Sequence, residues 1–126
     1  ILGDAAGEIG DYQGSAYAVR RSYAQQNPQI VIAFTRAIMN AHNMLRADEK
    51  LALEVLRARV KEMPEKDAVA LVARMRGPHG FFPDAALSKK GIENVFKLRS
   101  TYTGEPPLTN LDRYVDFSWA EKAKQK

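Results

Sequence analysis

The sequence predicts an α/β chain rich in helix, with about one clear strand and four to five helices in its 126 residues. Apolar residues recur at spacings of three and four over most of the chain, which is the period of an amphipathic helix. One short run, Ser15 to Arg20, alternates instead, as a strand does. Since one strand cannot pair its own backbone groups, two interpretations stay open. The chain is either a helical bundle with a stray extended segment or part of a larger α/β domain whose other strands lie upstream.

The segment before the strand is rich in glycine, which favours turns, so we expect a connector over residues 1–14. After the strand and a turn at Ser22 to Gln26, Asn27-Pro28 predicts the start of a long helix that runs to about Ala47. Asn27 is a suitable cap, and proline is tolerated at the first helical position because its missing N–H needs no partner there.

Two more helices follow directly. Asp48 is a suitable cap for the second helix, and Pro64 marks its end and the start of the third. Gly77-Pro78 ends the third helix. The loop beyond it contains Phe81-Phe82, and we expect both rings to be buried and to order the loop.

The last part of the chain predicts one long helix and one short one. Ser88 caps the long helix, and Thr103-Gly104 breaks it. Residues 108–117 have an irregular pattern. Ser118 is expected to cap a short terminal helix that reaches Lys124.

Composition excludes several classes of function. The 19 basic and 15 acidic residues give a net charge of +4 and are interspersed, as on a solvated surface. Nucleic-acid binding would need a basic stripe with aromatic residues, so we expect no nucleic-acid partner. The chain has no cysteine, which excludes disulfides, zinc–thiolate sites and cysteine nucleophiles. Its longest apolar run, Ile30 to Phe34, is far below the roughly 20 residues that span a bilayer.

Few residues carry reactive chemistry. The two histidines, His42 and His79, lack a second ligand at helical spacing, so no metal site is predicted. His42 is expected to be structural, whereas His79 lies in a glycine-rich loop with a weak case for touching a ligand. The G-x-S-x-G elbow of serine hydrolases is absent. We therefore predict no catalytic residue, no cofactor and no enzymatic activity.

A more suggestive group lies beside the predicted strand. Tyr12, Tyr17 and Tyr23 bracket Gln13-Gly14-Ser15, which supplies an amide, an exposed backbone N–H and a hydroxyl next to an aromatic wall. Such donors suit a small anion or a planar solute, because glycine lets a ligand approach the backbone closely. The predicted ligand-binding residues are Tyr12, Gln13, Gly14 and Ser15. The alternative is that the tyrosines only pack at a strand edge.

The order of these features resembles a known family. The run YQGSAYAVRR at 12–21 is followed by Asn27-Pro28 and a long helix, and LDRYVD at 111–116 precedes the terminal helix. This order is similar to the latter part of the substrate-binding proteins of nitrate, sulfonate and taurine ABC importers, a group that includes thiamine-pyrimidine synthase-like proteins. The turn Ser22 to Gln26 departs from the family's pattern because it lacks the usual acidic residue.

The resemblance implies that the chain is the helix-rich C-terminal segment of a two-lobed type II periplasmic-binding-protein-like fold. Residues 1–14 would be a connector near the hinge, and 15–126 the strand and helices of the first lobe. The implied function is the solute-binding component of an ABC importer for a small anionic or organic solute, in the periplasm or anchored outside the membrane. Its implied partners are the solute, an ABC permease, and either a second copy or an upstream fragment of the same protein.

Two alternatives belong to other classes of function. Proteins of the same fold include enzymes, such as pyrimidine-precursor synthases and a desulfinase, although this chain shows no reactive residues for such a role. Without the resemblance, the three successive amphipathic helices also fit a self-standing helical interaction domain.

Overall fold

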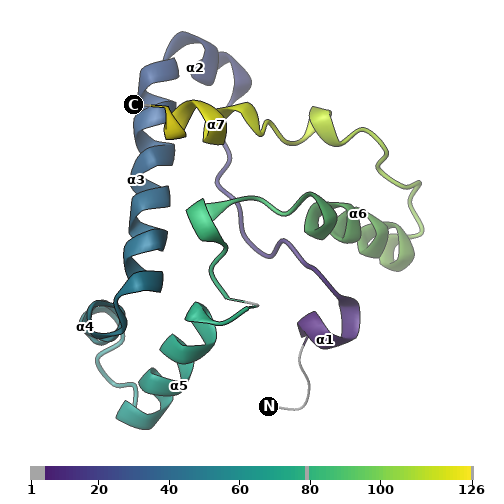
Figure 1. The fold of residues 1–126 in the computed structure, drawn as a ribbon. Helices are drawn as coiled ribbons and strands as arrows, with labels where there is room; N and C mark the ends of the chain where they lie inside the picture. Colours follow the sequence, from purple (N-terminus) through teal and green to yellow (C-terminus); the bar gives the residue numbers. More distant parts are fainter. Residues whose placement is uncertain (1–4, 79, 126) are drawn as a thin grey trace. The chain divides into compact units, whose positions relative to one another are not determined.

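The computed structural model describes residues 5–78 and 80–125, which contain seven α-helices and two short 3-10 helices. Contacts divide the chain into two compact units: Ile1–Ala33 together with Leu87–Lys126, and Phe34–Ala86. Figure 1 shows the elements along the chain: α1 Ala5–Ile9, α2 Arg21–Gln26, α3 Pro28–Ala47, α4 Glu49–Arg59, α5 Glu65–Arg76, η1 Pro83–Ala85, α6 Lys89–Thr103, η2 Leu111–Arg113 and α7 Ser118–Lys124.

The α/β prediction is wrong, because the described residues contain no strand and no sheet. The two-lobed fold with a clear strand that the resemblance implies is therefore not seen. Ser15 to Arg20 is non-helical chain that leads into α2, and all six of its residues are exposed (Figure 1). An alternating pattern favours extended backbone, but a strand also needs a neighbour for its N–H and C=O groups. No other strand is found among the described residues to supply one.

In the first unit, α2, α6 and α7 each bury one or two small or apolar residues. Ala24 of α2 is 3% exposed and Ile92 of α6 is 8% exposed. Gly91, next to Ile92, is buried as well. In α7, Ala123 is 3% exposed. With so few buried side chains, polar contacts and helix caps contribute much of the local order in this unit.

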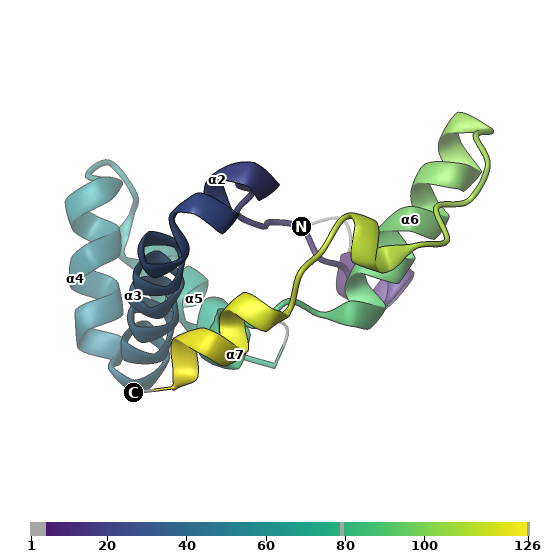
Figure 2. The ribbon, with the colours of Figure 1, turned by 90° about the horizontal axis from the view of Figure 1, so that it is seen from above.

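In the second unit, α4 and α5 pack against each other next to the C-terminal half of α3 (Figures 1 and 2). Ala68 is fully buried and Val72 is 2% exposed. An ion pair of 2.7 Å between Arg57 and Glu65 joins the end of α4 to the start of α5. Since both partners are largely exposed, this pair contributes little to stability.

Two arginines connect α3 to the rest of the second unit. The Arg76 Nε donates to the Arg46 carbonyl oxygen at 3.0 Å, and its Nη1 lies 2.6 Å from Oε2 of Glu49. Arg46 in turn donates to the carbonyl oxygen of Phe81. These contacts tie the C-termini of α3 and α5 together and fix the loop that follows α5.

That loop contains two consecutive residues in the left-handed region, Asp84 with φ 55° and Ala85 with φ 47°. Asn43 of α3 contacts Asp84 twice. Its Oδ1 accepts from the Asp84 N–H at 3.0 Å, and its Nδ2 donates to the Asp84 Oδ1 at 2.8 Å. Phe81 is partly buried, but Phe82 is 37% exposed, so the expectation of two buried rings holds only in part.

The long helices begin where their sequence signals place them. The predicted bounds of α3 are confirmed, and Asp48 caps α4 by accepting from the Leu51 N–H at 3.0 Å. Ser88 caps α6 by accepting from the Gly91 N–H at 2.9 Å. Each side-chain cap satisfies one of the N–H groups that a helix start leaves without a partner.

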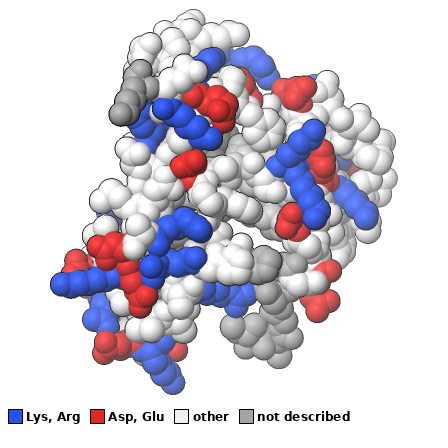
Figure 3. Space-filling view, in the orientation of Figure 1, with Lys and Arg blue, Asp and Glu red and all other residues white. Residues whose placement is uncertain are grey.

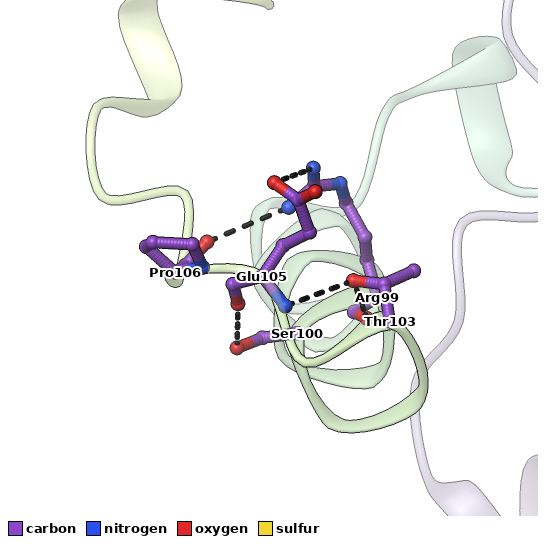
Figure 4. A network of polar contacts seen from close by, with 5 residues as sticks. All are labelled: Arg99, Ser100, Thr103, Glu105 and Pro106. Carbon is purple, nitrogen blue, oxygen red and sulfur yellow. Dashed lines mark hydrogen bonds and ion pairs between the residues drawn. The ribbon is translucent and has the colours of Figure 1, made fainter.

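The end of α6 is fixed by a network of polar contacts (Figure 4). Gly104 has φ 69°, and its N–H donates to the Ser100 carbonyl oxygen at 3.0 Å. The Ser100 hydroxyl donates to the Glu105 carbonyl oxygen at 2.7 Å, and Arg99 contacts the Glu105 carboxylate at 3.3 Å. The predicted helix end at Thr103-Gly104 is thus confirmed, because glycine adopts the left-handed conformation at little cost.

Predictions for the connector, for the turn before α3 and for the end of α4 are wrong. The connector contains a short helix, α1, and the turn expected at Ser22 to Gln26 is the helix α2. The Asn27 side chain donates back to the Tyr23 carbonyl oxygen at 3.1 Å, so its amide nitrogen serves the end of α2. Helix α4 ends at Arg59, before Pro64.

The start of α7 also differs from the prediction. Ser118 is the first residue of the helix rather than its cap. Its N–H donates to Oδ1 of Asp116 at 3.0 Å. The predicted end of the helix at Lys124 is confirmed.

Candidate functional site

The first unit contains a cavity of about 580 Å³. Its lining combines aromatic rings, charged groups and small apolar side chains. The aromatic and charged residues are Tyr17, Tyr114, Trp119, Arg21, Arg113 and Asp116. Ligand pockets in proteins commonly have volumes of 300–1,000 Å³ and combine apolar walls with a few polar anchors. The cavity has this size and this composition, and it is open to solvent, because its three charged residues are exposed and Tyr17 is 71% exposed.

Four parts of the first unit form the walls of the cavity. Gln13 and the exposed residues 16–19 form the first wall, and α2 after them contributes Arg21 and Ala24. Helix α6 contributes Ile92 and Val95. The next wall consists of residues 113–116, which are the last residue of η2 and the three residues after it. Helix α7 contributes Trp119. The cavity therefore brings together residues from the beginning and the end of the chain.

Of the four predicted ligand-binding residues, Gln13 lines the cavity. Tyr12, Gly14 and Ser15 do not belong to its lining, and all three are exposed. The Tyr12 ring lies beside Gly14 instead, because a Cβ at Gly14 would be 3.5 Å from it. The predicted wall of three tyrosines is not assembled here, since only Tyr17 of Tyr12, Tyr17 and Tyr23 lines the cavity.

Gln13 has a structural role that the sequence did not indicate. Its Nε2 donates to the Ser15 carbonyl oxygen at 2.7 Å, and its Oε1 accepts from the Ser88 N–H at 2.8 Å. The amide therefore joins the segment 13–15 to the residue that caps α6. This contact holds one wall of the cavity in place and leaves less of the amide free for a ligand.

The residues before Gln13 are fixed to the first turns of α6 as well. The Asn94 Nδ2 donates to the carbonyl oxygens of Ile9 and Asp11, with a distance of 3.1 Å to the latter. Lys90 lies 3.4 Å from the Asp11 carboxylate. Gly91 allows this approach, because a Cβ there would be only 2.9 Å from the Gln13 backbone nitrogen. The connector is thus held along the N-terminal half of α6.

Among the described residues that line the cavity, Asp116 is the only acidic one. Hydrogen bonds from Ser118 hold its pKa below the ordinary value of 3.8, partial burial opposes this effect, and the positive charges of Lys122 and Arg21 reinforce it. Asp116 is therefore ionised at neutral pH. With Arg21 and Arg113 also in the lining, the cavity has one positive charge in excess.

The wall at α7 carries a further cation. The Lys122 Nζ lies 4.4 Å from the centre of the Trp119 ring, within the range of a cation–π contact. This contact holds the indole next to a positive charge. It adds to the positive potential around the cavity.

Four residues of the lining were not predicted as site residues: Arg21, Arg113, Asp116 and Trp119. A signal was present, since 12–21 and 111–116 were the two runs on which the family resemblance depended. Nothing in the linear sequence indicated that the two runs meet at one cavity.

The second unit has a smaller cavity of about 150 Å³ with an almost entirely apolar lining, which includes Leu45, Leu56, Val72 and Phe81. His42 lies near this region, with its ring centre 4.7 Å from that of Phe81. Its Nδ1 is buried without a hydrogen-bond partner among the described residues. The prediction for His79 lies outside the described residues.

Charges and possible metal ligands are dispersed over the described residues. Basic and acidic side chains are intermixed on the face shown in Figure 3. No group of three histidine, aspartate or glutamate side chains gathers within the part of the chain that the structure describes. Among the described helices, none combines the length and apolar character needed to cross a membrane.

Comparisons of the chain with protein-family models, curated proteins and solved structures found no match.

Proposed function

We propose that the chain is part of the solute-binding component of an ABC importer and captures a small anionic or organic solute. The observation that carries this proposal is the cavity of about 580 Å³ in the first unit, with its aromatic and charged lining. Aromatic rings provide contact area for a solute, and a few charged groups fix its orientation. Capture without chemical conversion requires no more than this.

The two runs that resemble importer proteins both contribute to this cavity. The run 12–21 supplies Gln13, Tyr17 and Arg21, and the run 111–116 supplies Arg113 and Asp116. They lie about 90 residues apart in the sequence and were identified from their order alone. Their meeting at one cavity supports a shared role in binding.

The proposal also includes the location of the protein and its partner. The protein acts in the periplasm or anchored outside the membrane, and it delivers the solute to a permease. We expect this chain alone to bind weakly, because the cavity is open: Tyr17 of its lining is 71% exposed and Tyr114 is 52% exposed. Its test therefore needs solute concentrations that reach the millimolar range.

The test is thermal unfolding of the 126-residue chain with small oxyanions, sulfonates, taurine and pyrimidine precursors. A ligand at about 100 times its dissociation constant adds about 2.7 kcal/mol of stability, which raises the midpoint by several degrees. Tyr17→Ala should abolish the shift because Tyr17 lines the cavity. Tyr12→Ala is the matched control, since Tyr12 is exposed outside it.

Three results would contradict the proposal. The first is the absence of any shift over the whole panel. The second is an equal loss of the shift in both tyrosine variants. The third is recovery of a chemically altered solute by mass spectrometry, which would favour an enzyme.

A helical interaction domain is the second candidate, because the second unit exposes large apolar side chains. Met44 of α3 is 56% exposed, and Val55 of α4 and Val69 of α5 are each 42% exposed. Sedimentation over a range of concentrations tests self-association. A dimer that Met44→Glu dissociates would support this candidate, whereas a monomer at all concentrations would remove it.

A further inference from the structure

We infer that the cavity of the first unit takes an aromatic carboxylate, whose carboxylate is bound by Arg21 and Arg113 and whose ring lies among Tyr17, Tyr114 and Trp119. This inference rests on the proposed function and narrows its solute to one chemical class. It follows from the charge balance of the lining, from the free donors of the two arginines and from the number of aromatic rings.

The charge balance favours a monoanion. The lining contains two guanidinium groups and one carboxylate. That carboxylate, Asp116, already accepts a hydrogen bond of 3.0 Å from the Ser118 N–H. A cation would meet two arginines, and a compact dianion would be opposed by Asp116 and would leave the aromatic walls uncovered.

The arginine donors are available for a ligand. Within the part of the chain that the structure describes, the side chains of Arg21 and Arg113 make no hydrogen bond or ion pair. A guanidinium presents its N–H groups in a planar fork that matches the two oxygens of a carboxylate. Arg21 lies at the start of α2 and Arg113 at the end of η2, so two separate elements supply the charge.

The aromatic walls favour a planar ring over an aliphatic chain. Three aromatic side chains line the cavity, and rings attract one another in offset or edge-to-face arrangements. Trp119 already contacts Lys122 through its ring. An aromatic carboxylate combines one negative charge with one planar ring, and the lining offers cationic groups for the first and aromatic side chains for the second.

Trp119 is the only tryptophan of the chain, and it lines the cavity, so its fluorescence reports on binding directly. The experiment titrates the 126-residue chain with benzoate, with its neutral analogue benzamide and with the cation benzylamine. We expect benzoate to change the emission with a dissociation constant of about 1 mM, and the other two to bind at least about tenfold more weakly.

Variants identify the groups that bind the carboxylate. Arg21→Gln and Arg113→Gln should each weaken benzoate binding by about tenfold, as expected for a lost charge-assisted hydrogen bond. Arg20→Gln is the matched control, because Arg20 is exposed and does not line the cavity. Arg21→Lys keeps the charge but lacks the planar fork, so its affinity for benzoate should fall several-fold. This variant keeps the inference testable if a glutamine variant fails to fold.

Three results would overturn the inference: no response to benzoate, equal affinity for benzamide, or an equal loss in Arg20→Gln and Arg21→Gln. The thermal-unfolding panel of aliphatic and inorganic solutes distinguishes failure of this inference from failure of the proposed function. A midpoint shift with one of those solutes, combined with no benzoate binding, removes the aromatic carboxylate and leaves solute capture intact. The absence of any shift and any benzoate response removes both.

Discussion

Gly91→Ala tests whether the connector lies against α6 as closely as the structure shows. A Cβ at this buried position would be 2.9 Å from the Gln13 backbone nitrogen and 3.1 Å from the Ser88 side chain. Backbone cannot move aside as the end of a flexible side chain can. The segment at Gln13 must therefore shift, and its 2.8 Å hydrogen bond to Ser88 would be strained or lost.

The expected change in the free energy of unfolding combines one gain with two costs. Alanine gains up to about 1 kcal/mol over glycine in a helix. Overpacking costs about 1–3 kcal/mol, and a lost hydrogen bond costs about 0.5–1.5 kcal/mol. We expect Gly91→Ala to lower the free energy of unfolding by about 1–2 kcal/mol. In a chain of this length, that lowers the thermal midpoint by roughly 4–8 °C.

Circular dichroism during heating measures the effect, with Gly14→Ala as the control. A Cβ at Gly14 would make an ordinary contact of 3.5 Å with the Tyr12 ring, so the control should stay within about 0.5 kcal/mol of the parent. A midpoint that rises in Gly91→Ala would refute the reasoning. It would mean that the helical preference of alanine acts without opposition and that the connector is not held against α6.

Three further predictions follow from single contacts. Asp48→Ala removes the acceptor of the Leu51 N–H and should lower the free energy of unfolding in urea by about 1 kcal/mol; an unchanged midpoint would show that this contact does not stabilise α4. Asn94→Ala removes two hydrogen bonds to the connector, each worth about 0.5–1.5 kcal/mol, and should lower the free energy of unfolding by about 1–3 kcal/mol, so an unchanged midpoint in urea would contradict the anchoring of the connector on α6. Asp116→Asn tests a pH dependence. The folded state holds the pKa of Asp116 below 3.8, so the ionised carboxylate stabilises the fold above the unfolded pKa, and this contribution is lost as the pH falls through the folded pKa. The difference in thermal midpoint between parent and variant should therefore shrink from about pH 6 to about pH 2, and a constant difference would count against it.

The long helices could be predicted because their signals are local. Asp48 and Ser88 precede apolar repeats and can reach the N–H groups of the first turn without help from distant residues. Gly104 ends α6 through its own backbone conformation. In each case the deciding interaction lies within five residues of the helix end.

The strand and the short helices could not be predicted by the same reasoning. The alternation over Ser15 to Arg20 says which side chains share a face, but pairing depends on a second segment. Helix α2 starts at Arg21 without a side-chain hydrogen bond at its cap, so the usual N-terminal signal is absent. Helix α1 has only five residues, too few to show a period.

The candidate site was predicted only in part for a related reason. Gln13 and Tyr17 were recognised because their residue types suit a ligand and lie close together in the sequence. Arg113 and Trp119 reach the same cavity from the other end of the chain, which only tertiary structure can show. A charged residue in an irregular stretch looks like any solvated residue until its neighbours are known.

The loop at Asp84 and Ala85 depends on a residue far from it in the sequence. Non-glycine residues in the left-handed region cost roughly 1–2 kcal/mol each, so the loop does not prefer this conformation by itself. Asn43, 41 residues before Asp84, supplies two of the hydrogen bonds that hold it. Part of the information for the loop's shape is thus encoded in α3, and the loop sequence transplanted to another scaffold would lose the two contacts that Asn43 makes with Asp84.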